Sequence, residues 1–311
     1  MHEYRVEPVG DDHHEFFYTI HSRTLNTLNK SYLLPVDHDE VKRSDIHHRL
    51  VQFVFKGKNY VGPVKEALQF GQQRRGSYPL LDLGTGSGTW AIDIADEFPR
   101  AEVIGVDLAP IQPSHVPPNC TFEVCDLDQL YIPYPDAHFD LIHARSLHIG
   151  IHDYPRFLRE VARLLRPGGL VLLVEPTLSP CQPPPTQAPM AGWTALWRTY
   201  RGCLSQQLID VTVPEHLPDL LAATAAFENI IVRDGNIPVG FWPQDPHLLS
   251  AGQLQWMDYE LLLPALRPLF LCNGLPPSIV DRLIQDAQHD LYHPAYPLST
   301  LLHIAYASKC F

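Results

Sequence analysis

The sequence predicts an α/β fold in which a mostly parallel sheet carries helices on both faces. Short, continuously apolar segments alternate with amphipathic ones between residues 79 and 176, which is typical of parallel strands covered on both sides. A glycine-rich turn joins the first of these strands to a helix, and an acidic residue stands near the end of each of the first three strands. In such a sheet the turn and the acids meet at one edge.

Residues 1–78 form a polar, His-rich lead. Within it, residues 45–55 predict an amphipathic helix that ends at Gly57, and a second helix begins near Pro63. The expected apolar face of the first helix comprises Ile46, Leu50, Phe53 and Val54.

From residue 79 onward, hydrophobic periodicity and helix-stop signals define the remaining elements. The Arg-Pro-Gly-Gly sequence at 166–169 is expected to end the helix that starts at residue 154, since glycine caps a helix and proline cannot continue it. The expected strands are 79–83, 102–107, 121–125, 139–143, 170–175, 228–233 and 300–307. The expected helices are 89–98, 154–165, 193–207, 213–226, 247–270 and 276–291.

Composition excludes several functions for this chain of 311 residues. The net charge is -12 and no long Lys/Arg run occurs, which argues against a nucleic-acid partner. The start lacks a secretory signal, and no apolar run approaches the ~20 residues of a membrane helix. None of the six cysteines forms a C-x-x-C pair. We therefore expect a reduced, cytoplasmic location, with the nucleus as the alternative, and no metal site.

The strongest motif is the segment from Asp82 to Gly88, Asp-Leu-Gly-Thr-Gly-Ser-Gly, between a strand and a helix. Its glycines, Gly84, Gly86 and Gly88, permit tight-turn angles and close approach of a ligand. The helix that follows offers free amides and a partial positive charge. A nicotinamide site prefers G-x-G-x-x-G, whereas here the third glycine comes one residue early. This disfavours an oxidoreductase.

The pattern D-x-G-x-G-x-G resembles motif I of the class I (Rossmann-like) S-adenosylmethionine-dependent methyltransferases. The resemblance implies that Gly84 and Gly86, with Thr85 between them and Gly88 after them, border the cofactor. It also implies that Asp82 helps to hold the cationic methionine end. The cofactor would be S-adenosyl-L-methionine, and S-adenosyl-L-homocysteine would be the product.

Two further acids support this interpretation. Asp107 ends the second strand, where a carboxylate can accept both ribose hydroxyls, and Leu108 follows it in the same site. Asp126 follows the third strand and can accept the adenine amino group, while the backbone of Leu127 reads the ring edge. Each aspartate alone is equally consistent with a helix cap or a turn. Three acids at three successive strand ends favour the cofactor.

The chain also resembles the fungal LaeA-like methyltransferases, a family associated with secondary metabolism. The resemblance covers roughly residues 30–307, and the family includes both pathway enzymes and regulators. It implies a seven-stranded sheet of order 3-2-1-4-5-7-6 with the last strand antiparallel. It also implies a helical segment over 1–78 that covers the cofactor, with Tyr32 and Arg43 at the pocket, before a methyltransferase domain over 79–311. The matching positions are Tyr32, Leu34, Pro35, Asp37, Glu40, Arg43, Asp45, His47, His48, Gly57, the Ile-His-Ala-Arg segment ending at Arg145, and 238–243.

Methyl transfer to an alcohol or phenol needs a base, for which histidine is suited near neutral pH. His143, His148 and His152 lie at or after the fourth strand, and His148 is the first choice, since His143 is more typical of a structural position. The acceptor pocket is expected from the N-terminal segment and from helical insertions at about 177–226 and 247–295. The Pro-rich stretch 176–189 is either a lid or a surface connection. Candidate lining residues are Trp193, Trp197, Tyr200, Phe241, Trp242, Trp256 and Tyr259.

The predicted function is therefore methyl transfer, by preference to oxygen, on a small apolar or aromatic molecule. The alternative is a LaeA-like regulator that acts through protein partners.

Overall fold

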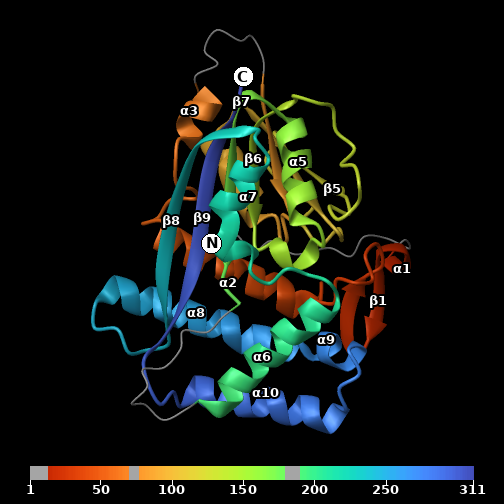
Figure 1. Cartoon of the computed structure of the whole chain (residues 1–311), viewed down its shortest axis with the longest axis vertical. Helices are drawn as coiled ribbons and strands as arrows, with labels where there is room; N and C mark the ends of the chain where they lie inside the picture. Colours follow the sequence, from red (N-terminus) through yellow and green to blue (C-terminus); the bar gives the residue numbers. More distant parts are fainter. Residues whose placement is uncertain (1–12, 70–76, 179–189) are drawn as a thin grey trace.

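The computed structural model describes residues 13–69, 77–178 and 190–311. A seven-stranded sheet forms its upper part in the view of Figure 1. In spatial order the strands are β5 (Cys120–Val124), β4 (Ala101–Asp107), β3 (Tyr78–Leu83), β6 (Phe139–Arg145), β7 (Leu165–Pro176), β9 (Leu298–Lys309) and β8 (Phe227–Val239). The first five are parallel, and β9 runs antiparallel to both β7 and β8. The predicted fold class and strand order are confirmed.

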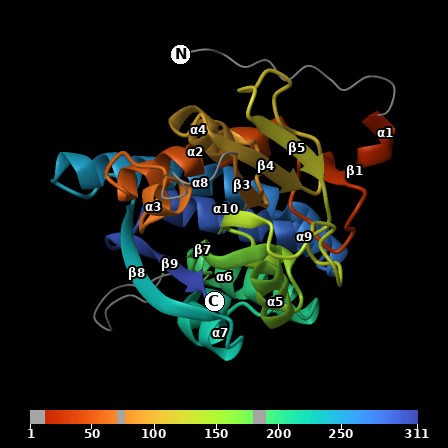
Figure 2. The ribbon, with the colours of Figure 1, turned by 90° about the horizontal axis from the view of Figure 1, so that it is seen from above.

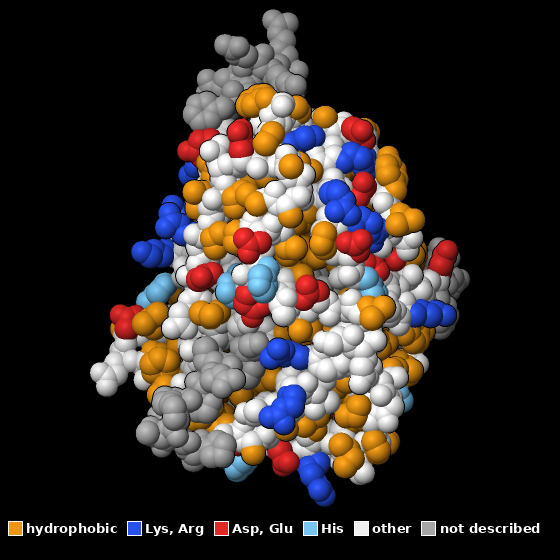
Figure 3. Space-filling view, in the orientation of Figure 1, with side chains coloured by type: hydrophobic (Ala, Val, Ile, Leu, Met, Phe, Trp, Pro, Cys, Tyr) orange, Lys and Arg blue, Asp and Glu red, His pale blue; other side chains and the backbone are white. Residues whose placement is uncertain are grey.

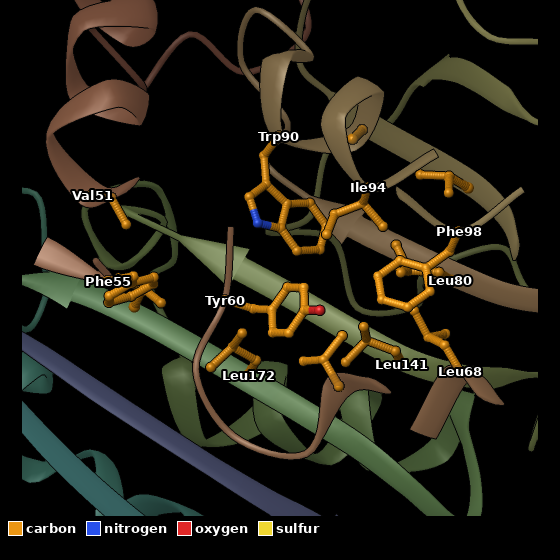
Figure 4. Close-up of a cluster of buried hydrophobic side chains, with 14 of the residues drawn as sticks. Val51, Phe55, Tyr60, Leu68, Leu80, Trp90, Ile94, Phe98, Leu141 and Leu172 are labelled. Carbon is orange, nitrogen blue, oxygen red and sulfur yellow. The ribbon is translucent and has the colours of Figure 1, made fainter. Parts of the chain in front are cut away.

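Helices cover both faces of the sheet, as Figure 2 shows from above. On one face lie α3 (Val64–Gln69) and α4 (Thr89–Glu97), and on the other α5 (Tyr154–Leu164) and α7 (Leu217–Ala223), which follows a 3-10 turn, η2 (Val213–His216). Figure 4 shows Trp90 and Ile94 of α4 packed over Leu80, Leu141 and Leu172 of three adjacent strands. Each fully buried apolar side chain stabilises the fold by ~1.5–3 kcal/mol. This packing holds the strands, and therefore the residues at their carboxyl ends, in fixed positions.

The long N-terminal helix α2 (His38–Val54) begins seven residues before the predicted start at residue 45. Asp37 caps it by accepting a hydrogen bond from the Glu40 amide. Ile46 and Leu50 are buried as expected. Phe53, expected on the same apolar face, is instead 37% exposed and lies beside His247, with ring centroids 5.5 Å apart.

Further helices form a layer below the sheet in Figure 1, with α2 between them and the strands. They are α6 (Ala191–Gln206), α8 (Pro246–Ala265), α9 (Arg267–Cys272) and α10 (Pro277–Tyr292). The single helix predicted over 247–270 is two helices, because Pro268 has no amide hydrogen to continue α8. This layer has its own apolar core, and α2 packs along α8.

Two local predictions are corrected. The first concerns the N-terminal segment, which is expected to be helical. After a short helix α1 (His13–Phe16) it contains a hairpin of β1 (Phe17–Ile20) and β2 (Arg23–Asn26). His21 and Ser22 take positive φ angles of 51° and 63°, as a two-residue hairpin turn requires. The second correction concerns 165–169: α5 ends at Leu164, and these residues already belong to β7.

The surface in Figure 3 mixes Lys and Arg with Asp and Glu, and apolar side chains lie among them. None of the helices in the described part of the chain combines the length and the apolar character needed to span a bilayer.

Candidate active site

Two adjoining cavities lie at the carboxyl ends of the parallel strands. The space between their walls is about 980 Å³ for the first and about 610 Å³ for the second, the open mouth of each included. The first is lined by many of the residues predicted to bind a cofactor: Tyr32, Arg43, Gly84, Thr85, Gly86, Asp107, Leu108, Asp126 and Leu127. Arg145, at the end of the Ile-His-Ala-Arg segment and also expected at the cofactor, lines it too.

The glycine turn forms the floor of the first cavity. Gly84 and Gly86 have φ angles of 70° and 58°. A Cβ at Gly84 would stand 2.8 Å from the Leu147 side chain, and one at Gly86 would stand 2.9 Å from the Ser44 hydroxyl. The backbone conformation therefore favours glycine at both positions, and a Cβ would require the Leu147 or Ser44 side chain to shift. Because Gly84 and Gly86 have no side chains, a ligand can approach the backbone of the turn closely. The space over these two residues is called the cradle below.

The third glycine has a different role. A Cβ at Gly88 would stand only 2.4 Å from the Phe122 ring, behind the turn. The sequence grouped Gly88 with the cofactor residues, whereas the structure assigns it to packing between α4 and β5.

Asp82 and His143 also lie behind the turn rather than in the cavities. Asp82 is 2% exposed and accepts hydrogen bonds from the Thr85 hydroxyl and His143 Nδ1, both at 2.7 Å. His143 stacks on Trp90 with ring centroids 3.7 Å apart. Burial lowers the pKa of His143 despite the neighbouring Asp82. We therefore do not retain His143 as a base, and Asp82 reaches the cavity only by positioning Thr85.

Asp107 and Asp126 both face the first cavity. Asp107 accepts hydrogen bonds from the Gly86 and Leu108 amides at 2.8 Å each, and burial raises the pKa of its carboxyl group to about 6. Asp126 accepts from Asn29 Nδ2 at 3.2 Å. Asn29 was not predicted; it ties the N-terminal segment to the strand tip that was expected to read adenine.

Arg145, at the end of β6, borders the same cavity beside His48, with 3.2 Å between Nη1 and Nδ1. Burial lowers the pKa of Arg145 to about 10.

Tyr32, Arg43, His47 and Ser146 line both cavities and so form the wall between them. Arg43 donates to Glu40 at 2.6 Å and to Asp258 at 2.8 Å.

This wall carries an ionised cluster. Burial alone would lower the pKa of Arg43, but Glu40 and Asp258 raise it overall. Burial would likewise raise the pKa of Asp258, but Arg43 and His47 outweigh it and lower the pKa. Asp258 was missed because it lies 215 residues from Arg43 and meets it only through the packing of α2 on α8.

The second cavity has aromatic walls. Trp197, Tyr200 and Tyr259 line it, as predicted from the sequence. The other aromatic candidates lie elsewhere: Trp193 is buried against Trp197, whereas Phe241 and Trp242 are 62% and 46% exposed, and Trp256 packs on Phe241. Of the Pro-rich stretch, residues 179–189 lie outside the described residues, but Pro176, Thr177 and Leu178 line the cavity.

His148, the preferred base, begins a 3-10 turn, η1 (His148–Gly150), and lines the second cavity. Its Nδ1 bonds Glu175 at 2.7 Å. His152 instead bonds Asp128 and is 33% exposed. Of the three histidines, His148 thus lines the second cavity.

A doubly wound sheet with this strand order, and with a glycine turn and strand-end acids around one cavity, is a class I methyltransferase fold of the Rossmann-like type. A family model described as "Methyltransferase domain" matches residues 46–230. The chain belongs to this methyltransferase family.

Relatives place it near the fungal LaeA-like proteins, as predicted. Methyltransferase pytC of Aspergillus terreus is 31% identical over 233 residues, covering 74% of this chain and 67% of that protein. The secondary metabolism regulator laeA of Coprinopsis cinerea is 31% identical over 291 residues, covering 88% and 69%. Among solved structures, Haemonchus contortus phosphoethanolamine N-methyltransferase 2 in complex with S-adenosyl-L-methionine is 18% identical, covering 86% of this chain and 57% of that one, with a TM-score of 0.45.

Proposed function

We propose that the protein transfers a methyl group from S-adenosylmethionine to an oxygen atom of a small apolar or aromatic molecule. The observation that carries this proposal is the pair of adjoining cavities with a common wall. One has the cradle and carboxylates that suit a nucleoside, and the other has aromatic sides that suit an acceptor.

In the first cavity, Gly84 and Gly86 would border the cofactor, and Asp107 would accept the ribose hydroxyls. Asp126 and the Leu127 backbone would hold the adenine. The bound cofactor supplies a sulfonium-activated methyl group; the protein supplies binding, orientation and electrostatics. Arg43 is paired with Glu40 and Asp258 in the common wall, so its positive charge is compensated where a cationic sulfonium would lie nearby.

Calorimetry with S-adenosylhomocysteine and with NAD tests the cofactor assignment. We expect binding of the first and none of the second, and the reverse result would overturn the proposal. Incubation of metabolite pools with methyl-labelled cofactor then identifies the acceptor. Label on a small molecule, absent with a Gly86→Trp variant, supports catalysis.

A second candidate function is regulation of secondary metabolism through protein partners, favoured by the name of the Coprinopsis relative. A solid apolar plug in place of the second cavity would support it, whereas the residues that line this cavity leave it open. Cofactor binding without transfer to any small molecule, together with capture of label on a partner protein, would favour the regulator.

A further inference from the structure

We propose that Glu175 positions His148 as a general base, and that the acceptor of this site is an uncharged aromatic compound with an acidic hydroxyl group, a phenol or an enol. This inference rests on the proposed function. It adds a residue that the sequence did not point to and narrows the class of acceptor.

The geometry begins with His148, which is 1% exposed and lines the second cavity. Its Nδ1 lies 2.7 Å from Glu175 Oε2. Its Nε2 is buried and has no hydrogen-bond partner among the residues that the structure describes. An unpaired buried nitrogen is unfavourable, and a ligand hydroxyl in the cavity would supply the missing partner.

Glu175 is itself fully buried near the end of β7. Its Oε1 accepts from the Leu147 amide at 3.1 Å and from the Tyr154 hydroxyl at 3.4 Å. Burial and the neighbouring Glu175 raise the pKa of Tyr154 well above its usual range, so this hydroxyl remains a donor. The Leu147 amide and the Tyr154 hydroxyl thus hold the Glu175 carboxylate in place, and the carboxylate orients the imidazole of His148.

This orientation sets the chemistry of the ring. A carboxylate accepts, so Nδ1 carries the hydrogen and Nε2 presents a lone pair. The acceptor O–H bond breaks and its proton passes to Nε2. With the cofactor bound, the oxygen would form the bond to the methyl carbon as the carbon–sulfur bond breaks, and the electron pair of that bond would go to sulfur. Glu175 stabilises the imidazolium, which later releases its proton to water.

The remaining walls select the acceptor. Trp197, Tyr200 and Tyr259 offer flat apolar surfaces that suit an aromatic ring. The other charged or titratable groups facing the cavity are Tyr32 and the cluster of Arg43, His47 and Asp258, in which Arg43 and His47 already bond carboxylates. No cation is left to bind a carboxylate or phosphate among the described lining residues, so an uncharged acceptor fits best.

The experiment uses 4-nitrophenol, whose phenolate is yellow and whose phenol is colourless. The full chain is saturated with S-adenosylhomocysteine, checked by calorimetry, and titrated with the probe at slightly acidic pH. We expect bound probe to be yellow in the unsubstituted protein, since the proton moves to His148. His148→Gln should bind colourless probe, and Glu175→Gln should reduce the bound phenolate about 10- to 100-fold, because a charge-assisted hydrogen bond is lost.

His152→Gln is the matched control, since it removes another histidine that bonds a carboxylate but lies outside the cavity walls. It should leave the colour unchanged. Glu175→Asp, which keeps the charge, should recover part of the phenolate signal that Glu175→Gln loses. All variants should bind S-adenosylhomocysteine, which shows that they fold.

The outcomes separate the two proposals. If the unsubstituted protein does not bind S-adenosylhomocysteine, the proposed function itself fails. If it does bind S-adenosylhomocysteine, but the probe stays colourless or does not bind, the role of His148 and Glu175 as a general base and the aromatic hydroxyl acceptor are refuted. Equal colour with Glu175→Gln refutes the positioning role.

Discussion

The third glycine of the turn offers a sharp test of the packing described above. Gly88 has a φ of 80°, and Gly57, on the surface after α2, has a φ of 81°. Alanine at either position pays the same conformational cost of ~1–2 kcal/mol. The two sites differ in the room available for a side chain. A Cβ at Gly57 would meet no atom within 4 Å, whereas a Cβ at Gly88 would stand 2.4 Å from Phe122 Cζ.

Overpacking of this kind costs ~1–3 kcal/mol. Gly88→Ala should therefore lower the free energy of unfolding by ~2–5 kcal/mol and Gly57→Ala by ~1–2 kcal/mol, measured by urea denaturation. Because Phe122 causes the difference, Gly88→Ala combined with Phe122→Ala should show a coupling of ~1–3 kcal/mol in a double-mutant cycle. The double variant should still bind S-adenosylhomocysteine. Equal effects at the two glycines, or a coupling near zero, would refute the packing role.

Four further predictions concern ligand binding and the wall between the cavities. Gly86→Trp should abolish S-adenosylhomocysteine binding without unfolding the chain, because its side chain would fill the cradle beside Ser44; retained affinity in calorimetry would contradict the site. Asp107→Ala should weaken that binding by about 100-fold or more, since two hydrogen bonds to a charged group are worth ~3–6 kcal/mol, and unchanged affinity would remove the ribose role. Because burial raises the pKa of Asp107 to about 6, the affinity of the unsubstituted protein should fall as the pH drops through 6, and Asp107→Ala should lack this dependence. Asp258→Asn should lower the thermal midpoint by several degrees, because buried Arg43 loses a charged partner, and an unchanged midpoint would show that Glu40 alone suffices.

Much of the fold could be predicted from the sequence, because its signals are local. Apolar runs of strand length, stop residues and the glycine turn act over a few neighbours, and they predicted the sheet. The resemblance to fungal methyltransferases supplied the strand order. The ends of parallel strands necessarily meet at one edge, so the order of residues along the chain was enough to place Asp107 and Asp126 beside the turn.

Local signals failed at two places in the N-terminal segment. Phe53 fits the helical stripe of α2 by spacing, yet it is exposed, since the width of a buried face depends on what packs against it. The hairpin over 17–26 escaped prediction because its turn, His21 and Ser22, lacks the usual asparagine and glycine.

The sequence by itself determined the class of fold, the cofactor turn and the strand-end acids. Only the tertiary structure decided which side chains share a cavity: Arg43 with Asp258, and His148 with Glu175. It also separated Trp197 and Tyr259, which line the second cavity, from the exposed Phe241. The physical reason is that these contacts depend on how helices from distant parts of the chain pack, and no periodicity along the sequence records which of their faces meet.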